Sequence, residues 1–111
     1  MDAAKIDAAH DELAVIRLVN RYADAANRRD WDEFAPIYCA DGIWDVKGPP
    51  EWTYVLKGRD QIIAGRREMF AKIEFHVQMT HAIVAKVDGD RATASSTIGR
   101  LLETHRSAPV E

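Results

Sequence analysis

Apolar and polar positions follow a helical period through the first quarter of the chain. Between residues 11 and 27 the apolar side chains recur every three or four positions, which predicts a long amphipathic helix with a stripe formed by Leu13, Ile16, Val19, Ala23 and Ala26. Asp30 followed by Glu33 is a capping-box pattern and predicts a short second helix, with one face formed by Trp31, Phe34 and Ile37. We expect the two helices to form a hairpin over Arg28 and Arg29.

The middle of the chain carries signals for two short strands and a third helix. Residues 43–46 form a β-branched and aromatic run that ends before Gly48 and two prolines, and residues 53–56 are a second candidate strand. Asp60 is the expected N-cap of the helix, whose positions at helical spacing are Ile62, Ile63, Arg66, Met69, Phe70 and Ile73. The Arg66-Arg67 pair is most simply a solvated part of that helix.

From residue 74 onward, β-branched residues dominate on both sides of an Asp88-Gly89 dipeptide, which predicts a long antiparallel hairpin with a two-residue turn. With those two residues as the loop, the expected pairs are Ala85 with Ala92, Ile83 with Ala94, His81 with Ser96, and Met79 with Ile98. This set is mostly apolar, so we expect it to face the core.

Composition limits the class of protein. The 111 residues are 47% apolar and 30% charged, which fits one domain over residues 1–111. The net charge of -3, without a basic block, argues against a nucleic-acid partner. No apolar run approaches the roughly 20 residues of a membrane helix, and the first ten residues lack a signal-peptide pattern, so we expect a cytoplasmic protein without a membrane partner. Cys39 stands alone and is expected to be a small buried residue.

Six short segments stand out along the chain in this order: Arg21-Tyr22-Ala23-Asp24, Arg29-Asp30-Trp31-Asp32, Ile37-Tyr38, Asp41-Gly42-Ile43-Trp44, Gly58-Arg59-Asp60-Gln61-Ile62 and Val87-Asp88-Gly89-Asp90-Arg91-Ala92. In these segments and in its expected order of elements, the sequence resembles the SnoaL-like branch of the nuclear-transport-factor-two-like superfamily. The resemblance implies an α+β fold in which a cone-shaped, curved antiparallel sheet packs against the N-terminal helices, with a helix between short strands and a long hairpin. It also implies an apolar pocket for a small molecule.

Members of this family usually continue through further strands, whereas this sequence stops at Glu111. We therefore expect either that the domain lacks its final strand or strands, or that a partner supplies the missing edge. An exposed edge over residues 98–105 would favour such pairing.

His81 is the leading candidate for catalysis. The predicted pairing places it on the inward face, opposite Ser96, and its ordinary pKa of about 6.5 suits proton transfer at neutral pH. Met79, Ile98 and Arg100 would lie around it as substrate-binding residues. The alternative interpretation is a hydrogen-bonded histidine of the core.

Tyr22 stands at a position that resembles the oxyanion-binding tyrosine of ketosteroid isomerases, and its alternative role is an ordinary core residue. Where those isomerases carry a catalytic aspartate, this chain has Val46. Alternation along the strand places Trp44 and Val46 on one face and Asp45 on the other, so steroid-type isomerisation is not expected.

Asn27 occupies the position at which scytalone dehydratase-like members carry a catalytic aspartate. An amide can orient a water or carbonyl but cannot titrate, and its alternative role is to end the helix. His76 and His81 are five positions apart and face opposite ways on a strand, which argues against a shared metal. No phosphate-binding loop is visible, so we expect no cofactor.

The resemblance therefore suggests a small-molecule enzyme that performs cofactor-free acid-base chemistry: dehydration, cyclisation, isomerisation or hydrolysis. The expected ligand is an apolar, cyclic, oxygenated molecule. His81, Tyr22 and Asn27 would act on it, and the residues expected to bind it are Trp44, Val46, Met79, Ser96, Ile98 and Arg100. A homodimer is the expected oligomer. The alternative is a non-catalytic module of the same fold that binds a ligand or forms dimers.

Overall fold

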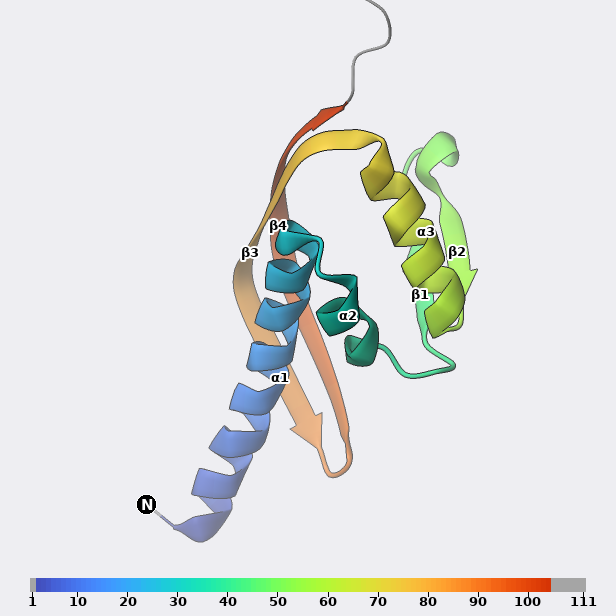
Figure 1. Ribbon diagram of the computed structural model, residues 1–111. Coiled ribbons are helices and arrows are strands. Elements are labelled where there is room, and N and C mark those ends of the chain that lie inside the picture. Colours follow the sequence, from blue (N-terminus) through green and yellow to red (C-terminus); the bar gives the residue numbers. More distant parts are fainter. Residues whose placement is uncertain (1, 105–111) are drawn as a thin grey trace, which may run out of the picture.

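The helices and strands follow one another in the expected order over residues 2–104, which the computed structural model describes (Figure 1). The elements are α1 (Ala3–Arg28), α2 (Trp31–Phe34), β1 (Ile43–Val46), β2 (Tyr54–Lys57), α3 (Arg59–Ala71), β3 (Ile73–Asp88) and β4 (Arg91–Thr104). Short 3-10 turns follow α2 and β1. His105, the last residue of the expected exposed edge, lies outside the described residues.

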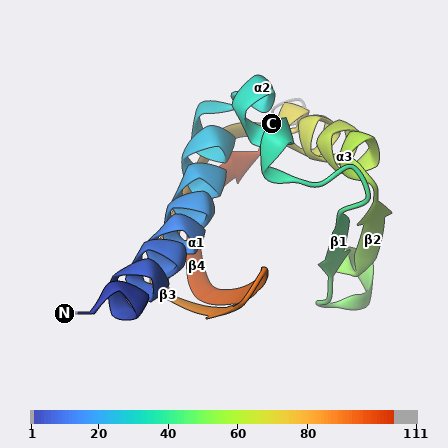
Figure 2. The ribbon, with the colours of Figure 1, turned by 90° about the horizontal axis from the view of Figure 1, so that it is seen from below.

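The strands form two separate antiparallel sheets, β1 with β2 and β3 with β4. Figure 2 shows the two hairpins apart from each other, with α1 along the β3–β4 hairpin and α3 close to one end of the β1–β2 hairpin. The predicted α+β class, with N-terminal helices against antiparallel strands, is confirmed. The curved sheet consists of two pieces in residues 2–104, and no strand of that range joins them.

The start of α2 agrees with the sequence-based prediction, whereas the starts of α1 and α3 differ from it. The Asp30 carboxylate accepts a hydrogen bond from the Glu33 N–H, as the capping box requires. Helix α1 begins well before residue 11, because Asp2 caps it by accepting from the Lys5 N–H. The expected cap of α3 is wrong: Gly58, with φ of 86°, precedes the helix and Asp60 lies in its first turn.

The register of the long hairpin differs from the predicted one. Asp88 pairs with Arg91, so the two-residue loop is Gly89-Asp90. Gly89 has φ of 60° at the first loop position, a conformation that suits glycine in a type II′ turn. Further along, β3 has one more residue than β4 between the His81–Thr97 and Val84–Ser95 pairs, which is a β-bulge. Ala82, inside it, has φ of 52°.

The bulge changes which residues of β3 point inward: even-numbered positions from residue 76 onward do so before it, and odd-numbered positions after it. On its C-terminal side Ile83 and Ala85 point inward, as expected, and both are at least partly buried. On its N-terminal side the inward residues are His76, Gln78 and Thr80. The expectation that Met79 and His81 face inward is therefore wrong. Both side chains approach Gly99 on the outer face, where a Cβ would stand 3.7 Å from Met79 Cε and from His81 Nε2.

The core lies where the end of α1, α2, α3 and the start of β3 meet. Its buried residues are Ala25, Ala26, Phe34, Phe70 and Ile73, with half-buried aromatic rings packed around them. Cys39 is exposed, contrary to expectation, because the turn after α2 carries it out of this core. The half-buried aromatic rings around this core position the candidate site.

Candidate active site

A row of polar side chains crosses the inner face of the β3–β4 hairpin. We call it the polar strip, and its members are His76, Gln78 and Thr80 on β3 and Ser96 and Arg100 on β4. Gln78 pairs with Arg100 across the two strands, and Thr80 pairs with Ile98. His76 and Gln78 are buried, with exposed fractions of 8% and 3%. Buried polar groups are usually hydrogen-bonded, so the side-chain atoms of His76, Gln78 and Thr80 that lack a partner within residues 2–104 call for an explanation.

A hollow of about 270 Å³ adjoins one end of the polar strip. We call it the Tyr22 hollow, and its lining is Leu18, Val19, Tyr22, Ile37, Tyr38, Thr80, Ser96 and Ile98. The structure thus brings together three residues that the sequence analysis proposed for the site: Tyr22, Ser96 and Ile98. The lining is mostly apolar with a few hydroxyl groups, as in pockets for small molecules.

His76 is the histidine that faces the interior. Its ring centroid lies 4.6 Å from that of Phe70, and its Nδ1 has no hydrogen-bond partner in the part of the chain that the structure describes. Burial lowers the pKa of His76, and the positive charges of Arg100 and Arg66 lower that pKa further. The imidazole is therefore neutral at neutral pH and can accept a proton.

Tyr22 connects the hollow to the aromatic core. Its ring centroid lies 5.4 Å from Phe34 and 6.0 Å from Trp44. Burial raises the pKa of the Tyr22 phenol, and the charges of Arg66 and Arg100 oppose that rise. Burial also holds the pKa of Tyr38 well above its ordinary value. Both phenols stay protonated at neutral pH and can donate hydrogen bonds to a ligand.

Arg66 is buried, which overturns the expectation of a solvated helix face. Its exposed fraction is 1%, and its guanidinium carbon lies 4.5 Å from the ring centroid of Trp44 and 4.8 Å from that of Phe70. Nη1 lies 3.9 Å from the Met69 sulfur, whereas Nε and Nη2 have no hydrogen-bond partner within residues 2–104. Burial lowers the pKa of Arg66, because desolvation disfavours the charged form.

Asn27 and Arg29 fasten the end of α1 to distant parts of the chain. The Asn27 amide donates to the Gln78 carbonyl at 2.9 Å and accepts from the Gln78 N–H at 2.7 Å. Arg29 donates to the carbonyl oxygens of Phe70 and Ile73. Asn27 does not end the helix, since the residue in left-handed conformation after α1 is Arg29. Its amide holds the strand that carries the polar strip.

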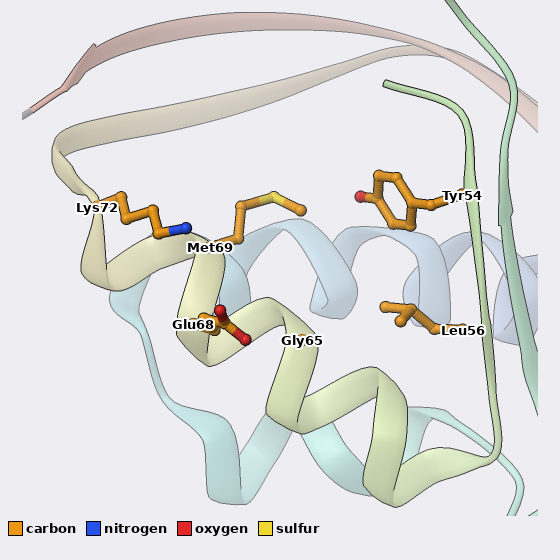
Figure 3. A pocket seen from close by; sticks show the side chains of 6 residues that line it. All are labelled: Tyr54, Leu56, Gly65, Glu68, Met69 and Lys72. Atoms are coloured by element: carbon orange, nitrogen blue, oxygen red, sulfur yellow. The ribbon is translucent and has the colours of Figure 1, made fainter. Parts of the chain in front are cut away.

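The β1–β2 hairpin packs against Tyr22 and Tyr38 through Trp44, and against α3. Trp44 and Val46 are half-buried while Ile43 and Asp45 are exposed, which confirms the predicted alternation. A second hollow, of about 340 Å³, lies between β2 and α3 (Figure 3), and its lining is Tyr54, Leu56, Gly65, Glu68, Met69 and Lys72. Helix α3 packs closely there, because a Cβ on Gly65 would stand 2.8 Å from Leu56 Cδ1.

Sequence reasoning missed His76 and Arg66. The sequence suggests His76 only as a metal ligand. The bulge that separates its face from that of Ile83 contains no glycine, so the sequence pattern does not show that His76 faces inward. Arg66 did carry a signal: it stands four positions after Ile62 and four before Phe70, both of which are buried. In residues 2–104 no three His, Cys, Asp or Glu side chains gather as metal ligands. No helix of that range is long and apolar enough to cross a bilayer.

Known structures share this architecture. A proposed aromatic ring hydroxylase from Novosphingobium aromaticivorans matches with a TM-score of 0.77 and 21% identity, over 86% of this chain and 66% of that one. A proposed dehydratase of the NTF2-like family from Streptomyces avermitilis matches with a TM-score of 0.70 and 22% identity, over 84% of this chain and 72% of that one. A proposed scytalone dehydratase from N. aromaticivorans matches with a TM-score of 0.71 and 14% identity, over 86% of this chain and 62% of that one. The chain thus spans about two thirds of the length of these proteins.

Family membership rests on the sequence as well as on the fold. No curated protein matches the chain. The model of the SnoaL-like domain, however, matches residues 7–108, which is nearly the whole sequence and includes every candidate site residue named above. This chain belongs to the SnoaL-like domain family.

Proposed function

We propose that this chain is a SnoaL-like enzyme that performs cofactor-free acid-base chemistry on an apolar, cyclic, oxygenated small molecule. The observation that carries this proposal is His76, a buried histidine with an unpartnered Nδ1 on the strand face that continues into the Tyr22 hollow. Dehydration, cyclisation, isomerisation and hydrolysis each need a proton acceptor and a hydrogen-bond donor in a site of this kind. Two of the similar structures are proposed dehydratases, which supports the same class.

The roles follow from the ionisation states. The neutral His76 imidazole would accept a proton from the substrate, since its pKa lies below the ordinary value. The Tyr22 phenol, whose pKa is raised, would donate a hydrogen bond to the oxygen on which negative charge develops. Asn27 cannot replace the carboxylate of a histidine-carboxylate pair, and it would act on the site by positioning the backbone of Gln78.

Elimination of 5-nitrobenzisoxazole tests for the base, because this apolar cyclic probe releases a coloured phenolate when one proton is removed. We expect His76→Ala to reduce the rate in the full chain by about 100-fold, the usual contribution of a positioned base. His10→Ala, at an exposed position of α1, is the matched control. The rate should fall as the pH drops through the pKa of His76.

The same assay decides between the two histidines. His81 stays a sequence-based prediction, although it lies on the outer face of the hairpin. A large loss in His81→Ala with an unchanged rate in His76→Ala would refute the assignment to His76. Loss in neither variant would remove both residues from the chemistry.

The second candidate is a non-catalytic module that binds an apolar ligand or forms a homodimer. The outer face of the β3–β4 hairpin favours dimer formation, because it carries exposed apolar side chains: Phe75, Met79 and Leu101, which are 50%, 39% and 59% exposed. Native mass spectrometry of the purified chain reports subunit number and any retained small molecule. A dimer without turnover of the probe at any pH would support this candidate over the enzyme. The cytoplasmic location also stays a proposal.

A further inference from the structure

We propose that the ligand of the Tyr22 hollow carries a carboxylate that binds side-on to Arg66. The inference rests on the proposed function only in using the same hollow as the seat of the apolar part of the ligand. Arg66 is 1% exposed, and no salt bridge within residues 2–104 involves it. A buried guanidinium without a partner is costly, so its position calls for an anion.

The unpartnered atoms identify the kind of anion. Nε and Nη2 of Arg66 lack hydrogen-bond partners in the described part of the chain, whereas Nη1 lies against the Met69 sulfur. The N–H bonds of Nε and Nη2 point in parallel from one edge of the planar guanidinium. Two parallel donors match the two oxygens of a carboxylate, while a phenolate or a ketone offers a single oxygen.

The charges around Arg66 are consistent with an anionic ligand. The groups that act on its charge are the phenols of Tyr22, Tyr38 and Tyr54 and the second cation, Arg100. None of these is a carboxylate, and the phenols are neutral at neutral pH. The interior therefore holds a positive charge for which residues 2–104 provide no acidic side chain, and a ligand carboxylate would neutralise it.

The aromatic side chains connect this charge to the hollow. The guanidinium faces the Trp44 ring, and that ring lies 6.0 Å from Tyr22, which lines the hollow. Tyr38, in the same lining, lies 6.1 Å from Trp44. The proposal places the ring of the ligand beside Tyr22 and Tyr38 and extends its carboxylate past Trp44 to Arg66, which does not itself line the hollow. The substrate class that fits is an aromatic or alicyclic carboxylic acid.

Calorimetric titration of the full chain with 2-naphthoate and with 2-naphthamide tests the proposal, since the two probes share a ring system and differ in charge. We expect the naphthoate to bind about 10- to 100-fold more tightly, the range of charge-assisted hydrogen bonds. Arg66→Gln should reduce naphthoate binding to the level of the naphthamide and leave naphthamide binding unchanged. Unchanged naphthamide binding also shows that this variant folds.

Two further variants serve as controls. Arg67→Gln removes a neighbouring but exposed charge of α3 and should keep the preference for naphthoate. Arg100→Gln removes the other cation of the site. If the preference for naphthoate survives in Arg66→Gln but disappears in Arg100→Gln, the anion binds at Arg100 and the proposal is overturned. Equal binding of both probes, or binding of neither, would also overturn it.

The outcome is separable from that of the proposed function. Binding of 2-naphthoate involves no proton transfer, so calorimetry measures it independently of the elimination of 5-nitrobenzisoxazole. An Arg66-dependent preference without His76-dependent elimination of 5-nitrobenzisoxazole would refute the catalytic role and support the carboxylate site. Elimination that depends on His76, without preference for naphthoate, would refute the carboxylate site alone.

Discussion

Replacement of Arg66 by methionine should make the ligand-free chain more stable. A buried polar group without a partner costs about 1–3 kcal/mol, and Arg66 has two such nitrogens. Against this, the variant loses cation–π contacts with Trp44 and Phe70, each worth about 0.5–2 kcal/mol. Methionine is unbranched, fills similar space and regains part of that energy through contacts between sulfur and the rings. The net expectation is a gain of about 1–3 kcal/mol.

Urea unfolding followed by far-ultraviolet circular dichroism measures this change. With a slope of about 1–2 kcal/mol per molar urea for a chain of this size, the unfolding midpoint of Arg66→Met should rise by roughly 1 M. Arg67→Met, at an exposed position of the same helix, should change stability by no more than about 0.5 kcal/mol. A loss of more than about 1 kcal/mol in Arg66→Met would refute the reasoning, since it would mean that the guanidinium stabilises the core.

Three further predictions concern His76, Asn27 and Ala82. Because the pKa of His76 is lower in the folded chain than its ordinary 6.5, the unfolded chain binds more protons below about pH 6.5. Stability should therefore fall as the pH drops through 6.5, and urea titrations of His76→Phe should lose that component. Asn27→Ala should cost about 1–3 kcal/mol in the same assay, because both backbone groups of Gln78 lose their partner; a neutral result would mean that the two bonds contribute nothing. Ala82→Gly should raise the melting temperature, because a φ of 52° costs glycine about 1 kcal/mol less than it costs alanine. The control Ala94→Gly, in regular strand, should lower the melting temperature.

The sequence predicted the elements well because their signals are local. The capping box at Asp30, the short run in β1 and the period of α3 each depend on residues within one or two turns of chain. The fold class followed from the order of these elements. Family resemblance added the expectation of a pocket and of Tyr22 in it, and the hairpin pairing added Ser96 and Ile98. These three residues line one hollow.

The site was harder to predict because it depends on side-chain direction along β3. Polar and apolar residues alternate only over 76–80, and residues 82–85 are all apolar, so the pattern does not reveal where the strand changes face. A bulge with alanine at positive φ carries no sequence mark, unlike one with glycine. The turn lies one position later than expected, at Gly89-Asp90, which changes the pairing partners but not the inward face of Ile83 and Ala85. The bulge alone moves His81 from the predicted inner face to the outer one.

The attachments of Asn27 and Arg29 have a consequence for the order of folding. They join the end of α1 to residues 51, 41 and 44 positions further along the chain. An isolated helix forms within about a microsecond, but closing loops of this length costs conformational entropy before the contacts repay it. Helix α1 can thus form early, while its docking must wait until β3 exists. The polar strip is therefore assembled in a late step, when α1 docks on β3 and distant parts of the chain meet.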